Sequence, residues 1–106
     1  MKLRILHVFD DSESRTRGLQ GMVIDQRSCA LFVYESAAPR SFWMKDVPMD
    51  LFLSNVVEGE CVESEFMGAL STKPHKLSQP TFLAVESRVE IPVGSTVAIE
   101  DGFLVF

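Results

Sequence analysis

Apolar residues in this chain gather in short runs that are separated by turn-forming residues. Leu3 to Phe9 is a run that ends at Asp10-Asp11, and Cys29 to Tyr34 is continuously apolar, as in a strand buried on both faces. The same criteria predict further strands at Ser41 to Met44, Asp50 to Val56, Glu60 to Met67, Thr81 to Glu86, Thr96 to Glu100 and Phe103 to Phe106. About eight short strands with no long internal repeat predict an all-β fold, a compact sandwich or small barrel. The 106 residues are expected to form a single domain, 1–106.

Two dipeptides predict tight hairpins between neighbouring strands. Glu58-Gly59 and Asp101-Gly102 each join two of these runs, and an acidic or amide residue followed by Gly suits a type I′ turn. In the strand after the first hairpin, Glu63 and Glu65 fall on one face, so we expect that face to be solvated. Residues 68–79 are expected to form a polar connection.

One segment, Asp10 to Met22, has the features of a helix. Asp10 or Asp11 can cap its first turn. Arg15, Leu19 and Met22 follow at the spacing i, i+4, i+7, which places them on one helix face. Gly18 and Gly21 weaken the helix. We therefore expect a short helix of two to three turns near residues 11–21.

The charge pattern narrows the classes of partner. The net charge is −5, and residues 54–106 carry the whole excess, with three basic and eight acidic groups. Binding to nucleic acid or to an anionic membrane relies on Lys and Arg, so neither partner is expected. No uncharged stretch is longer than nine residues, as in 91–99, whereas a bilayer span needs about 20. The first residues are too charged for a secretory signal, so we expect a cytoplasmic protein.

The cysteines and histidines give no strong sign of a metal site. Cys29 and Cys61 lie in apolar runs and are expected to be buried thiols, although a disulfide is open if their Cα atoms lie within about 7 Å. His7 is expected to be a core imidazole and His75 a solvated loop residue. No His or Cys pair has ligand spacing, and no glycine-rich phosphate loop is present, so we predict no metal and no cofactor. The acidic residues around the first hairpin could attract a cation, but strand alternation places Glu60 opposite to the other glutamates of its strand.

The segment from Pro39 to Asp50 is the most distinctive part of the chain. It holds the only Trp, Trp43, together with two prolines and four charged residues among large apolar ones. A buried charge needs a partner and a buried indole N–H needs an acceptor. We therefore expect this segment to present polar groups around an aromatic wall.

Several segments together make the chain similar to a known family. It resembles the prokaryotic proteins catalogued as domain of unknown function 192, in order and spacing from about residue 10 to residue 100. The segments that carry the resemblance are Arg15-Thr16-Arg17-Gly18-Leu19, Leu31 to Tyr34, Pro39 to Asp46, Asp50, the Glu58-Gly59 hairpin and Phe82 to Glu86. The resemblance implies a mostly β fold of sandwich type and supplies no activity and no catalytic residues.

The chain departs from the family pattern at several points. Gln20 stands where the family usually has Met, and Asp46 stands where it has Asn. The step from Lys45 to Asp50 is about two residues short, and a helical piece after the late Glu is missing. The resemblance is therefore to a compact, divergent member in which the loops around a pocket are trimmed.

A set of polar residues from separate segments forms the candidate site. We expect Arg17, Arg40, Lys45, Asp50 and Glu86 to ring a pocket walled by Phe42 and Trp43. Because guanidinium groups bind carboxylates and phosphates, and indole offers a stacking face, the leading hypothesis is a binding module for a small polar or anionic molecule.

Three other interpretations remain open from the sequence. The same charges could form a structural network, with Arg40 paired to Asp50 and Arg17 to Glu86. Asp50 and Glu86 could serve as the acid–base pair of a hydrolase-like or isomerase-like enzyme. The protein could also be a structural interaction partner without a ligand site. The sequence does not predict the oligomeric state.

Overall fold

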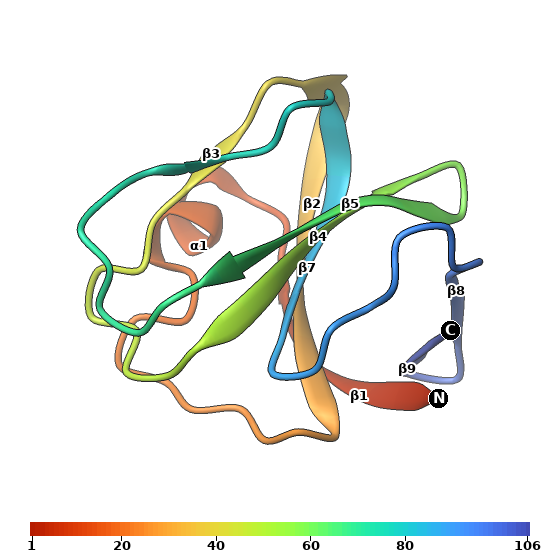
Figure 1. The fold of residues 1–106 in the computed structure, drawn as a ribbon, viewed down its shortest axis with the longest axis horizontal. Helices are drawn as coiled ribbons and strands as arrows, with labels where there is room; N and C mark the ends of the chain where they lie inside the picture. The colour runs from red at the N-terminus through yellow and green to blue at the C-terminus, as the bar shows by residue number, and fades with distance from the viewer.

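The computed structural model describes all 106 residues and confirms a mainly β fold with one short helix. Seven strands form one sheet in the order β5-β4-β7-β2-β1-β9-β8, which curls into a half-barrel (Figure 1), and β3 and β6 form a separate pair. The elements in chain order are β1 (Lys2–Phe9), α1 (Ser12–Arg17), β2 (Ser28–Ala38), β3 (Ser41–Phe42), β4 (Leu51–Val57), β5 (Glu60–Met67), β6 (His75–Lys76), β7 (Thr81–Ser87), β8 (Ala98–Glu100) and β9 (Phe103–Val105). No helix is long and apolar enough to cross a membrane.

The first two strands are parallel, and this sets the position of the helix. β1 pairs with β2 in parallel, with Phe9 opposite Phe32 near one end of the ladder. Parallel neighbours need a crossover connection, here residues 10–27, which contains α1. The helix therefore lies on one face of the sheet, at the left of Figure 1, away from β8 and β9.

Both faces of the central strands are covered by apolar side chains. Ala30 and Phe32 of β2 belong to a buried cluster on the helix side of the sheet. Cys29 and Leu31 belong to a second cluster on the side of β8 and β9. The continuous apolar run of β2 thus reflects burial on both faces, as its pattern predicts.

The helix is shorter than the sequence predicts. Asp11 is its N-cap, and a capping box joins Asp11 to Ser14, whose backbone N–H donates to the Asp11 carboxylate over 2.7 Å. The helix ends at Arg17 because Gly18 adopts φ +51°, outside the helical region. A Cβ at Gly18 would lie 3.4 Å from the ring of Phe32, so glycine also allows the turn to sit close to the core.

Both predicted hairpins form at the expected dipeptides. Glu58 and Gly59 have φ values of 50° and 77°, and Asp101 and Gly102 have 51° and 81°, as two positive φ angles in a type I′ turn require. The expected polar connection at 68–79 is only partly correct, because it contains β6, which pairs with β3.

The fold predicts how strongly the terminal strand contributes to stability. Leu104 in β9 is fully buried between Leu3 of β1 and Ile99 of β8, whereas the Ile99 side chain is 53% exposed. We expect Leu104→Ala to lower the free energy of unfolding by about 2–5 kcal/mol, because it leaves a cavity. The matched variant Ile99→Ala should cost under about 1 kcal/mol. Urea denaturation of both variants checks this, and a loss for Leu104→Ala as small as that expected for Ile99→Ala would show that β9 is not part of the cooperative core.

Candidate functional site

A cavity of about 420 Å³ opens between α1, β2 and the segment that enters β3. Helix α1 contributes Arg15 and Arg17, and the sequence after β2 contributes Arg40 and Trp43. Glu86 reaches the same cavity from β7. The structure therefore brings Arg17, Arg40, Trp43 and Glu86, which the sequence singles out, to one cavity.

Tyr34, which the sequence analysis does not single out, lies between two of the arginines. The guanidinium carbon of Arg40 is 3.8 Å from the Tyr34 ring centroid, and that of Arg15 is 4.8 Å from it. Burial raises the pKa of the Tyr34 hydroxyl, although the two guanidinium groups oppose this. Tyr34 escapes notice in the sequence because it ends an apolar run and looks like one more strand residue.

Main-chain carbonyls hold two of these arginines in place. Arg15 Nη1 donates to the Val33 carbonyl over 2.9 Å, and its Nη2 lies 3.8 Å from the Glu35 carboxylate. Arg40 donates through Nη2 to the Ser36 carbonyl over 2.8 Å and through Nε to the Thr81 carbonyl over 3.4 Å. These bonds use part of each guanidinium and leave the remaining N–H groups for a ligand.

Glu86 is the most unusual residue of the cavity. In β7 it lies between Ala30 of β2 and Leu53 of β4, both fully buried apolar residues. Glu86 is 3% exposed, and its carboxyl group has neither a hydrogen-bond partner nor an ion-pair partner in the protein. Burial raises the pKa of this carboxyl to about 8, so it is mostly protonated at neutral pH.

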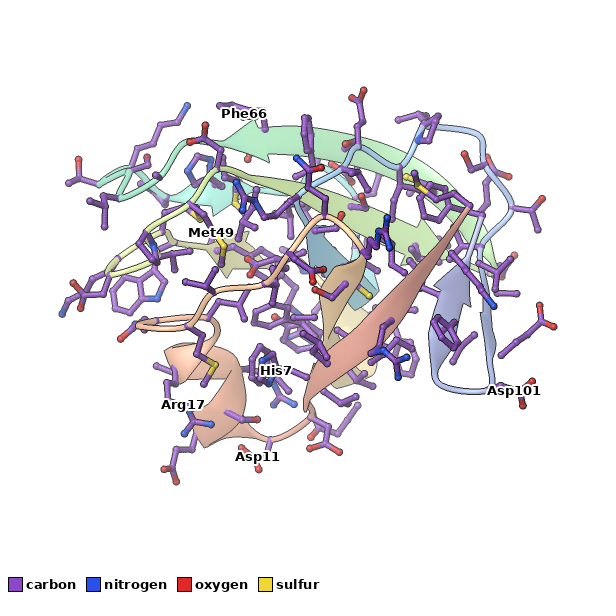
Figure 2. The ribbon with its side chains drawn as sticks, turned by 90° about the horizontal axis from the view of Figure 1, so that it is seen from below. His7, Asp11, Arg17, Met49, Phe66 and Asp101 are labelled. Atoms are coloured by element: carbon purple, nitrogen blue, oxygen red, sulfur yellow. The ribbon has the colours of Figure 1, made fainter.

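The rim of the cavity is more exposed than its floor. Trp43 is 50% exposed, and the Lys45 ammonium lies 5.7 Å from its ring centroid. Lys45 lines two neighbouring hollows next to Trp43 rather than the cavity that holds Glu86. Arg17 projects from α1 (Figure 2), is exposed, and makes no ion pair or hydrogen bond through its side chain.

Asp50 lies outside the cavity, contrary to the expected ring of polar groups. Its carboxylate accepts a hydrogen bond from the backbone N–H of Ala69 over 2.8 Å and so holds the loop after β5. Neither predicted ion pair, Arg40 with Asp50 or Arg17 with Glu86, is present. The reason is that Asp50 precedes β4 and is exposed, whereas Glu86 lies in the middle of the sheet.

Glu63 and Glu65 of β5 do not form the solvated face that the sequence predicts. They lie on the same face of β5 as buried Met67, opposite Leu53 and Asn55 of β4, and therefore point to the covered side of the strand. Glu63 accepts hydrogen bonds from the backbone N–H groups of Ser78 and Gln79 over 2.7 and 2.8 Å. The outer side of β5 instead carries Phe66, which is 55% exposed (Figure 2).

His75 is buried, which corrects the prediction of a solvated histidine. It is 2% exposed because β6 pairs with β3, with His75 opposite Phe42. Its Nδ1 lies 3.1 Å from Glu65 Oε2, and its Nε2 lies 3.3 Å from Ser71 Oγ. This connectivity is that of a Ser-His-acid triad. However, the Ser71 hydroxyl also accepts a hydrogen bond from the Lys73 N–H over 3.4 Å, and Glu63 accepts one from the same connecting segment. We therefore interpret the Glu65–His75–Ser71 hydrogen bonds as a tether that holds residues 68–79 to β5.

The remaining histidine and the cysteines lie away from the cavity floor. His7 is half-buried rather than a core residue, and its ring stacks on Phe9 with centroids 5.7 Å apart. Cys29 and Cys61 are buried free thiols, as predicted. Burial raises the pKa of Cys29 to about 12.

The buried carboxyl gives a prediction about stability and pH. The Glu86 pKa is about 8 in the folded protein and 4.5 in its ordinary state, so the folded protein holds more protons between these values. The free energy of unfolding therefore falls as pH rises from 4.5 through 8, with a slope that approaches about 1.4 kcal/mol per pH unit. Glu86→Gln should remove this slope, whereas exposed Glu100→Gln should keep it. Urea denaturation from pH 5 to 9 tests this, and parallel profiles for the wild type and Glu86→Gln would contradict it.

Comparisons with known proteins show a shared fold. No family model and no curated protein matches the chain. A crystal structure of a protein of unknown function from Novosphingobium aromaticivorans DSM 12444 is 16% identical, with a TM-score of 0.69 over 78% of this chain and 62% of that one. A candidate transcription regulator from Sinorhizobium meliloti 1021 is 19% identical, with a TM-score of 0.71 over 76% of this chain and 64% of that one. The chain thus spans less than two thirds of either neighbour, and at these identities the likeness shows the fold alone.

Proposed function

We propose that the protein is a binding module whose cavity takes a small anionic molecule. The supporting observation is that three arginines line one cavity although the chain as a whole carries a net charge of −5. The only acidic residue of the cavity, Glu86, is mostly protonated at neutral pH and so adds little opposing charge. Guanidinium groups at the wall of a concave site suit a carboxylate or a phosphate.

In this proposal the arginines bind the anionic group, and the aromatic residues contact the rest of the ligand. Arg15 and Arg40 are fixed by carbonyls of the β2 region, so they are already oriented before a ligand arrives. Arg17 has no competing partner and can turn toward an anion. Trp43 at the rim and Tyr34 in the wall provide aromatic surface for the rest of the ligand.

The proposal extends to the family of the protein and to its location in the cell. The family catalogued as domain of unknown function 192, which the chain resembles in sequence, is proposed as its family; residues 15–19 and 39–43, which carry part of that resemblance, line the cavity. A cytoplasmic location is supported by two free cysteines, which a reducing compartment preserves.

The structure does not favour the other function classes that the sequence leaves open. An enzyme that uses Asp50 with Glu86 needs both groups at one cavity, and Asp50 instead bonds to the Ala69 N–H outside it. A docking role could use the exposed Phe66 and its neighbour Phe52, whose rings are 5.5 Å apart, but no feature indicates what covers them.

Anion titration tests the proposal through an arginine whose loss leaves the fold intact. Because Arg17 makes no protein contact through hydrogen bonds or ion pairs, we expect Arg17→Ala to weaken inorganic phosphate binding about three- to tenfold without changing the melting temperature. Arg88→Ala, at an exposed position beyond β7, is the matched control and should bind as the wild type does. Trp43 fluorescence or the shift of its indole N–H in NMR spectra reports binding. Equal affinities for all three proteins, or no binding at all, would refute the proposal.

A further inference from the structure

The carboxyl group of Glu86 is a polar group without a partner at the floor of the cavity. Its neighbours in the sheet, Ala30 and Leu53, offer no hydrogen bond. Glu86 is 97% shielded by the protein, and what is left of its surface adjoins the cavity. The carboxyl oxygens are open only to the cavity, so their hydrogen-bond partner is whatever occupies it.

The cavity keeps this carboxyl neutral. An ionised carboxylate at such a site needs a cation in contact, and Glu86 makes no ion pair with Arg15, Arg17 or Arg40, which line the same cavity. A neutral carboxyl has one O–H donor and one C=O acceptor side by side. It can therefore form two parallel hydrogen bonds with a group that has the complementary pair.

We propose that the ligand of this cavity carries, in addition to its anionic group, a neutral primary amide or lactam that pairs with the Glu86 carboxyl through two hydrogen bonds. This inference rests on the proposed function, because the arginines are taken to hold the anionic group. The amide carbonyl accepts from the Glu86 O–H, and the amide N–H donates to the Glu86 carbonyl. Both unsatisfied groups at the floor of the cavity are then satisfied.

A ligand ammonium group is the competing partner for Glu86, and it requires the opposite protonation state. It would pair with an ionised carboxylate, so its binding would strengthen as Glu86 loses its proton. An amide would instead bind more weakly above a pH of about 8, the pKa of Glu86. The sign of the pH dependence therefore separates the two.

The other charged and titratable groups around the cavity keep their protonation state near neutral pH. β2 presents Tyr34, whose pKa is raised by burial, while β4 presents apolar Leu53 beside Glu86. The remaining charged groups that line the cavity are Arg15, Arg17 and Arg40. Guanidinium groups stay protonated over the range of the experiment, so Glu86 is the group that titrates near neutral pH.

Three probes with the same ring size test the inference directly. Pyroglutamate has a carboxylate and a lactam, cyclopentanecarboxylate has the carboxylate alone, and proline has the carboxylate and an ammonium group. At pH 6.5 we expect pyroglutamate to bind about three- to tenfold more tightly than cyclopentanecarboxylate, as expected for an added hydrogen-bonded pair. The preference should shrink toward one between pH 7 and 9. NMR titration of the Trp43 indole N–H measures all three affinities.

Two variants at Glu86 sharpen the result. Glu86→Gln keeps a donor and an acceptor, so the preference for pyroglutamate should persist and become independent of pH. Glu86→Met has similar volume without either group, so the preference for pyroglutamate over cyclopentanecarboxylate should vanish. The wild-type pH series needs no variant and decides the matter even if one of these proteins folds poorly.

The outcomes distinguish this inference from the proposed function. Equal affinity for pyroglutamate and cyclopentanecarboxylate at pH 6.5 would overturn the inference and leave an anion site. Tightest binding of proline, increasing above pH 8, would overturn it in favour of an ionised Glu86. Absence of binding by all three probes and by inorganic phosphate would overturn both.

Discussion

Parallel pairing of β1 with β2 is the constraint from which the rest of the structure follows. A chain that leaves the end of β1 must travel back across the sheet before β2 can begin, and α1 lies on that path. The helix is too short to cover the face completely, because Gly18 ends it after Arg17. The uncovered area beside the helix is where the cavity lies, so the same connection that closes the fold also brings two arginines to the site.

The floor of the cavity holds a carboxyl group where a protein core usually has an apolar side chain. A leucine at position 86 would suit its neighbours Ala30 and Leu53 better than a carboxyl does, and it would remove the loss of stability with rising pH. Local rules of sequence–structure agreement are broken most often where a site has a function. Glu86 therefore marks the cavity more clearly than Arg15 and Arg40, which also pack on Tyr34 and donate to main-chain carbonyls.

The sequence predicts the strands well and the site only in part, for a physical reason. Alternation and turn residues are local signals, and they place β5 and both hairpins correctly. Burial of polar residues depends on segments distant in the chain: His75 of β6 is buried because that strand pairs with β3, and Glu63 is covered because the backbone of Ser78 and Gln79 donates to it. Asp50 and Glu86 look equivalent in the sequence, yet one holds an exposed loop and the other lies under a cavity.

The two buried cysteines are natural probes of local unfolding. Cys29 lies in the middle of the sheet, and Cys61 lies at the edge strand β5, on the side of the sheet away from the cavity. A shielded thiol whose pKa is raised reacts with a disulfide reagent only while the surrounding structure is open. Cys61 is covered by the segment that follows β7, through Ile91, Gly94 and Ser95. The labelling rate of Cys61 therefore measures how often this segment leaves β5, and that of Cys29 measures how often the centre of the sheet opens.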